Sequence, residues 1–105
     1  MGEEMGFEER VELIATLSYE MVEKALVIIE EPEIINALIQ LFDDVAEKLR
    51  ELVDPGYPVN YHLWRIGNYV IYHEWRPSVG DDSLLIFNNP EALGIIDAYL
   101  ELILD

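Results

Sequence analysis

The first half of the chain carries two stretches in which apolar residues recur with the period of an α-helix. Between residues 7 and 30 they form one stripe with acidic residues opposite, which predicts a long first helix. The branched stretch 11–17 also suits a strand, but its spacing follows 3.6 better than 2. Pro32 breaks this helix and suits the first position of another, so we expect a second helix from there to about Leu52. Turn residues at 54–58 end it.

The second half changes to extended runs of aromatic and branched residues. Runs 59–66 and 69–76 flank the pair Gly67–Asn68, which predicts a β-hairpin with a two-residue loop. A third short strand is expected at 83–88. Residues 89–91 supply an N-cap asparagine, a first-turn proline and a first-turn acid, so a helix is expected over 90–105. The predicted fold is α+β, in the order α-α-β-β-β-α, with a three-stranded antiparallel sheet.

The two-residue loop also fixes which side chains lie opposite each other in the hairpin. Counting outward from Ile66 and Tyr69 places His62 opposite His73 on one face. Two adjacent imidazoles can clamp a divalent metal ion or titrate as a coupled pair, so His62 and His73 are the candidate metal ligands. A catalytic metal normally needs three protein ligands, and the expected neighbours on this face are aromatic. We therefore expect two packed histidines, and neither a cofactor nor a metal.

The other face of the hairpin also carries large apolar residues, among them Tyr61, Leu63, Val70 and Tyr72. A three-stranded sheet covered by helices on one side should leave its other face polar. Two interpretations stay open: another chain or a ligand covers this face, or the tips of Tyr61 and Tyr72 lie along the surface. The first would suit a small-molecule-sensing or regulatory module, which is the alternative function.

Charge narrows the possible partners. The 105 residues include 22 acidic and six basic ones, a net charge of −16, and one domain spanning 1–105 is expected. Nucleic acids and anionic membranes are bound through clustered Lys and Arg, so neither is an expected partner. Such a charge keeps a small protein soluble and also favours cationic partners. An acidic N-terminus, short apolar runs and the absence of cysteine predict a cytoplasmic location.

The last predicted helix carries acidic residues without a compensating cation. Asp97, Glu101 and Asp105 follow at i,i+4 spacing, where each like-charge pair costs about 0.2–0.5 kcal/mol. Ile95 and Leu102 flank this acidic stripe. It is either a solvated helix face or a surface that docks a basic partner or a second copy of the chain.

These observations together predict a small non-enzymatic interaction protein. The sequence has no glycine-rich phosphate loop, calcium loop or nucleophile elbow, so an enzyme is not expected. The expected partner is a basic protein surface, which suits an inhibitor, an antitoxin-like or immunity-like protein, or a nucleic-acid mimic, and a homodimer is expected. The predicted partner-binding residues are Asp97, Glu101, Asp105, Ile95, Leu102, Tyr61 and Tyr72.

Overall fold

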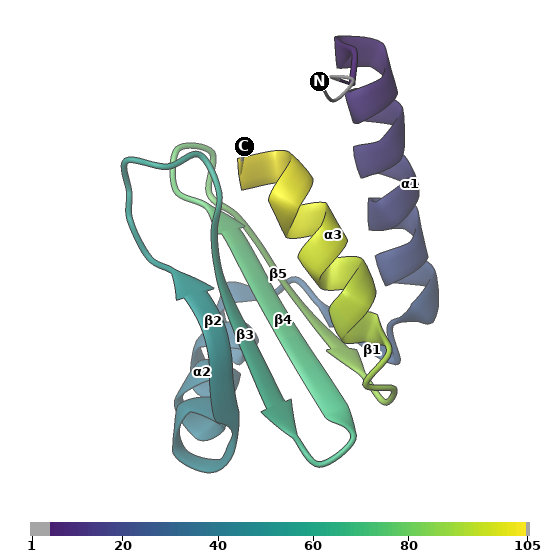
Figure 1. Cartoon of the computed structure of the whole chain (residues 1–105). Helices are drawn as coiled ribbons and strands as arrows, with labels where there is room; N and C mark the ends of the chain where they lie inside the picture. Colours follow the sequence, from purple (N-terminus) through teal and green to yellow (C-terminus); the bar gives the residue numbers. More distant parts are fainter. Residues whose placement is uncertain (1–4, 105) are drawn as a thin grey trace. The chain divides into compact units, whose positions relative to one another are not determined.

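The computed structural model describes residues 5–104 and divides into two compact units (Figure 1). One unit joins the two ends of the chain and consists of helices α1 (Phe7–Lys24) and α3 (Ala92–Leu104). The other, residues 25–90, contains helix α2 (Pro32–Val45) and a β-sheet. The assignment of the whole chain to a single domain stays a prediction.

The sheet is antiparallel, and its described strands number five. They are β1 (Val27–Ile29), β2 (Glu47–Leu52), β3 (Asn60–Ile66), β4 (Tyr69–Arg76) and β5 (Asp81–Phe87), in the spatial order β1-β5-β4-β3-β2. The predicted α+β class is confirmed, and the predicted count of three strands is wrong. The element order over residues 5–104 is α-β-α-β-β-β-β-α.

The two strands that the sequence did not predict replace the ends of predicted helices. Helix α1 ends at Lys24, and the β-branched run that follows it pairs with β5 as β1. Helix α2 ends at Val45, and Glu47–Leu52 pairs with β3 instead of continuing the helix. Its composition suits a helix, so tertiary pairing overrides local propensity here.

The predicted hairpin is confirmed residue by residue. Ile66 lies opposite Tyr69 and His62 opposite His73, and the pairing continues to Asn60 and Trp75. Gly67 has φ +59°, and among the described non-glycine residues none has positive φ. A type II′ turn has a positive φ at its first loop residue and not at its second. Its backbone twist matches that of the flanking strands.

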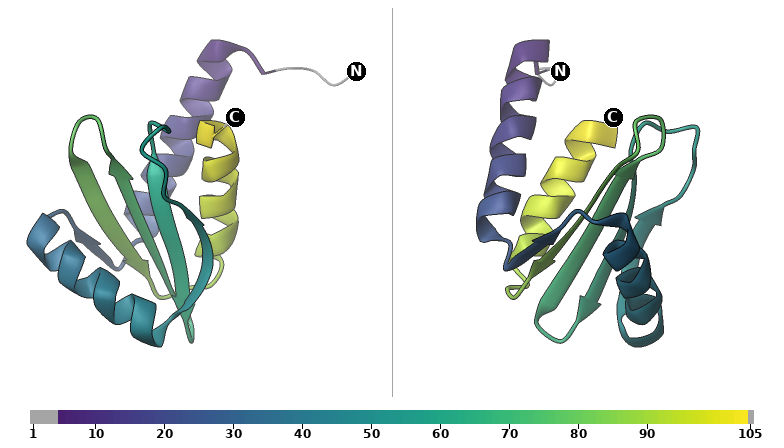
Figure 2. Two further views of the ribbon diagram at one scale, coloured as in Figure 1. Left: turned by 90° about the vertical axis from the view of Figure 1, so that its left-hand side faces the viewer. Right: turned by 180° about the vertical axis from the view of Figure 1, so that it is seen from behind.

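Helix α2 lies across one face of the sheet (Figure 2). Its Ile35 packs in a fully buried cluster with Trp64, Ile71 and Leu84, which come from β3, β4 and β5. Half-buried apolar residues surround this cluster, namely Ile29, Leu38, Ile39, Phe42, Ala46 and Ile86. The opposite face of the central strands is buried too, at Leu63, Val70, Tyr72 and Phe87. Because both faces are buried, the sequences of these strands are nearly continuous runs of apolar residues.

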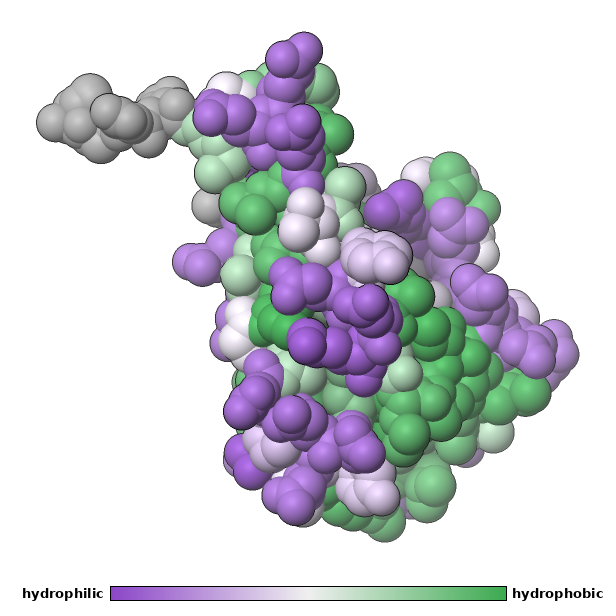
Figure 3. All heavy atoms as spheres, turned by 90° about the vertical axis from the view of Figure 1, so that its right-hand side faces the viewer, coloured by the Kyte–Doolittle hydropathy of each residue, from purple (hydrophilic) through white to green (hydrophobic). Residues whose placement is uncertain are grey.

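Apolar residues also lie exposed on the unit that contains the sheet. The large apolar residues that are exposed on β1 and α2 are Val27, Ile28, Ile34, Leu41 and Val45. Figure 3, which views the side of the molecule where β1 lies, shows a broad apolar area there.

Helices α1 and α3 pack against each other in the unit that joins the two ends of the chain. Arg10 of α1 donates a hydrogen bond from Nη1 to the carbonyl oxygen of Leu102, at 2.8 Å. A cation at a helix C-terminus is favourable, because the last carbonyl groups carry partial negative charge. The C-terminal helix therefore receives from α1 the cation that its own sequence lacks.

Within residues 5–104, the helices are too short or too polar for any of them to cross a bilayer.

Two glycine substitutions test the turn assignment. We expect Gly67→Ala to lower the free energy of unfolding by about 1–2 kcal/mol, because L-residues are disfavoured at positive φ. A Cβ there would meet no atom within 4 Å, so the cost is conformational. The matched control is Gly94→Ala inside α3, which also has open space and should raise stability by about 0.5–1 kcal/mol. Urea denaturation measures both, and an unchanged Gly67→Ala would contradict the turn assignment.

Candidate functional site

The half of the α2-facing sheet surface that carries the two histidines is filled by stacked rings. The rings of His62 and His73 have centroids 5.6 Å apart and planes 14° from parallel. Trp64 stacks on His62 at 5.0 Å. Trp75 stacks on both histidines, at 5.1 Å from His62 and 4.7 Å from His73. We call these four residues the histidine–tryptophan stack.

A carboxylate holds each histidine from a neighbouring strand. His62 Nδ1 lies 3.1 Å from Glu51 Oε1 on β2, and His73 Nε2 is hydrogen-bonded to Asp82 Oδ1 on β5. A neutral imidazole that donates to the carboxylate from one ring nitrogen has an acceptor at the other. His73 Nδ1 is buried without a hydrogen-bond partner among the described residues. The environment of His73 is therefore mainly one of ring packing.

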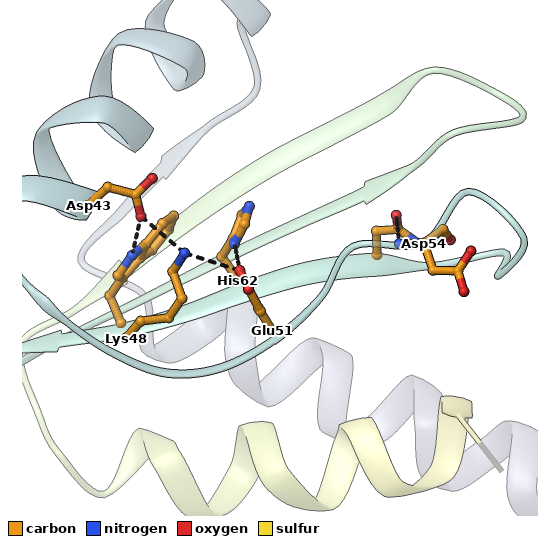
Figure 4. A network of polar contacts seen from close by, with 7 residues as sticks. Asp43, Lys48, Glu51, Asp54 and His62 are labelled. Atoms are coloured by element: carbon orange, nitrogen blue, oxygen red, sulfur yellow. Dashed lines mark hydrogen bonds and ion pairs between the residues drawn. The ribbon is translucent and has the colours of Figure 1, made fainter.

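A polar network ties the stack to α2 and β2 (Figure 4). Trp64 Nε1 donates to Asp43 Oδ1 of α2 at 3.1 Å. Lys48 Nζ lies 3.3 Å from the same oxygen and 3.0 Å from Glu51 Oε1. The hydrogen bond between Lys48 and Glu51 raises the pKa of the lysine and lowers the pKa of the carboxyl group, so both stay charged at neutral pH. These contacts fix the rotation of α2 about its axis.

Burial keeps both histidines neutral. It lowers the pKa of His62, and the charge of Lys48 and that of His73 in its protonated form act in the same direction. Burial also lowers the pKa of His73, against the opposing effect of Asp82. In the described part of the chain, no group of three or more His, Asp or Glu side chains is arranged to hold a metal ion. The predicted candidate pair lies side by side but lacks the third ligand that a catalytic metal normally needs.

Trp75 also lines a hollow of about 330 Å³ at the end of the strands. The hollow, which we call the acidic hollow, is formed by Glu30, Glu74, Trp75, Arg76, Asp81, Asp82 and Ser83. Strand register brings them together, since Trp75 lies opposite Asp82 and Glu74 opposite Ser83. Glu30 follows β1 directly, beyond the pair of Ile29 with Leu84.

Negative charge exceeds positive charge among the residues that line this hollow. Arg76 Nη2 lies 3.9 Å from Glu74 Oε2, and the Tyr72 hydroxyl donates to Glu74 Oε1 at 2.7 Å. Glu30 and Asp81 are exposed. Within residues 5–104 neither carboxylate is engaged in a hydrogen bond or ion pair. An excess of carboxylates suits a cationic group, because opposite charges attract.

The residues predicted for partner binding differ in how far they are exposed. Asp97 and Glu101 are exposed on α3, Ile95 and Leu102 are half-buried, and Asp105 lies outside the described residues.

Tyr61 and Tyr72 are only 3% and 1% exposed. They therefore do not form the exposed aromatic face that the sequence suggested, and Leu63 and Val70 beside them are buried as well.

The sequence did not predict the acidic hollow because it depends on β1. Residues up to 30 were expected to be helical, which gave no reason to place Glu30 near Asp81 and Asp82. A β-branched run of Val27–Ile29 before two acids was the available signal.

The chain as a whole matches no protein-family model, no curated protein and no solved structure.

The two histidines make stability depend on pH. A histidine whose pKa is lowered by folding contributes stability above its unfolded pKa, near 6.5, and that stability is lost as the pH falls through the folded pKa. We expect the wild type to lose more unfolding free energy between pH 7.5 and 5 than the double variant His62→Gln/His73→Gln. Urea denaturation at several pH values in this range measures the unfolding free energy of both proteins. The carboxylates are the same in both, so they contribute little to the difference between them. If the stability of the two proteins depended equally on pH, the conclusion that burial keeps both histidines neutral would be wrong.

Proposed function

We propose that this protein is a non-enzymatic acidic interaction protein that binds a basic surface of a partner protein through the acidic hollow. The observation that carries the proposal is the hollow itself, which is lined by Glu30, Glu74, Asp81 and Asp82, with Arg76 as the one cation among the described residues that form it. The proposed occupant is a lysine or arginine side chain of the partner.

The size and composition of the hollow support a side chain as the occupant. Its volume of about 330 Å³ is small for a ligand site and suits the end of one long side chain. Glu30 and Asp81 are exposed, so they can form ion pairs with an incoming cation.

The charge of the whole chain supports the same class of partner. A net charge of −16 attracts cationic proteins over long distances and raises their rate of association. The function proposed is that of an inhibitor, an antitoxin-like or immunity-like protein, or a nucleic-acid mimic. It acts in the cytoplasm and as a homodimer, and no step of it requires a cofactor.

A peptide titration tests the site. We expect hexa-arginine to bind the wild type, with a change in tryptophan fluorescence because Trp75 lines the hollow. The variant Glu30→Gln/Asp81→Asn should bind about fivefold to tenfold more weakly, since each exposed charge pair contributes up to about 1 kcal/mol. The matched control is Asp97→Asn/Glu101→Gln on α3, which removes the same charge from two other exposed acids and should change the affinity less than twofold.

Either of two results would contradict the proposal. If the α3 control weakens binding as much as the hollow variant, the peptide responds to net charge and not to a site. Binding that persists unchanged in 1 M NaCl, where the screening length is about 3 Å, would exclude an electrostatic contact.

A further inference from the structure

Among the described strands, β1 lies at one edge of the sheet and pairs with no other strand on its outer side. It pairs with β5 on one side, and the amide of Leu26 donates to the carbonyl oxygen of Ile86 at 2.7 Å. Backbone groups alternate along a strand, so those of Val27 and Ile29 point away from β5. The other edge strand, β2, carries charged residues and a register shift between Lys48 and Arg50, features that discourage further pairing. The β1 sequence, Val-Ile-Ile, has neither protection.

Side chains on both faces of this edge are apolar and exposed. Leu26 is 57% exposed, Val27 40% and Ile28 43%. Val27 pairs with Ile86 on the face covered by α2, and Ile28 pairs with Leu85 on the other face. A strand added to β1 would therefore bury apolar side chains on both faces.

Helix α2 carries a second apolar stripe besides the one that packs on the sheet. Ile34, Leu41 and Val45 are 46–52% exposed and lie within about 40° of each other around the helix axis. Asp43 projects about 180° from Ile34 and is bound to Trp64 and Lys48 on the β3 and β2 side. The exposed stripe therefore faces the other way, toward β5 and β1. Figure 3 shows apolar residues gathered there.

We propose that β1 and the exposed stripe of α2 form the interface of a homodimer. In it, the β1 strands of two copies pair antiparallel about a twofold axis, and the two α2 stripes pack against each other on the same face of the joined sheet. We call this interface the β1–α2 surface; its residues are Leu26, Val27, Ile28, Ile34, Leu41 and Val45. The inference deepens the dimer of the proposed function and rests on it, but it uses none of the residues that line the acidic hollow.

The geometry favours a second copy over another partner. Only Glu30 and Glu31 separate β1 from α2, so a twofold operation that joins two β1 edges also brings the two α2 stripes together. Antiparallel pairing places the acids after β1 at opposite ends of the paired strands, whereas parallel pairing would align them. A basic partner gains nothing from a surface without charges.

The amount of exposed apolar surface is also of the right order. Together, six large apolar residues that are each 40–57% exposed present on the order of 500 Å², shared between the two faces of the β1 edge and the stripe of α2. With backbone pairing and a polar rim, this approaches the roughly 800 Å² per partner of a stable interface.

Sedimentation velocity from 1 to 100 µM tests the proposal with matched variants. The wild type should sediment as a dimer, at twice the chain mass of 12.2 kDa. Val45→Lys and Val27→Lys should each raise the dimer dissociation constant at least tenfold. The controls are Val53→Lys and Val79→Lys, at 56% and 66% exposed valines outside the β1–α2 surface, which should change it less than twofold. All four variants lower the net negative charge by one, so charge repulsion cannot explain a difference between the pairs.

Each outcome decides the proposal. A monomeric wild type, a dimer that withstands both Val27→Lys and Val45→Lys, or equal effects of the controls would overturn it. Raising NaCl from 0.05 to 0.5 M should leave the dimer as tight or tighter, because salt screens the repulsion between two acidic chains. Hexa-arginine binding by Val45→Lys should match the wild type, so failure of the dimer and failure of the acidic hollow are separate results.

Discussion

Helix α2 packs on only part of one sheet face, and its position determines where the stacked rings, the ion pairs and the exposed apolar residues lie. Ile35 enters the cluster of Trp64, Ile71 and Leu84, and the bond from Trp64 to Asp43 sets the rotation of the helix. A helix of 14 residues does not extend over the whole face. The remaining part is filled by the sheet's own rings, which stack His62 and His73 with Trp75.

The same position of α2 separates charged from uncharged surface. On the β2 and β3 side, Asp43 of α2 joins an ion-pair network with Lys48 and Glu51. On the β1 side, the exposed stripe of α2 meets an edge strand without charges. The acidic hollow lies at the end of β4 and β5, where Trp75 links it to the stack. The acidic hollow suits a cation, whereas the β1–α2 surface suits the same apolar surface of a second copy. Added salt is therefore expected to weaken binding at the hollow and to leave the dimer as tight or tighter.

Local chemistry allowed the hairpin to be predicted, and long-range pairing prevented the same for the sheet edges. A glycine at a two-residue loop sets the register, which is why the pairing of His62 with His73 could be read from the sequence. Residues 47–52 have helical composition, and only pairing with β3 makes them a strand. The hollow and the β1–α2 surface both depend on β1. A periodicity argument that extends the first helix through residue 30 therefore misses both of them.

Nuclear Overhauser effects between two copies would show whether β1 and α2 of one chain contact those of another. A sample that mixes ¹³C-labelled and unlabelled chains reports only contacts between copies. We expect intermolecular effects among the methyl groups of Val27, Ile34, Leu41 and Val45. Intermolecular effects confined to α3, for example at Ile95 and Leu102, or none at all at concentrations where the wild type is expected to be a dimer, would contradict the proposed interface.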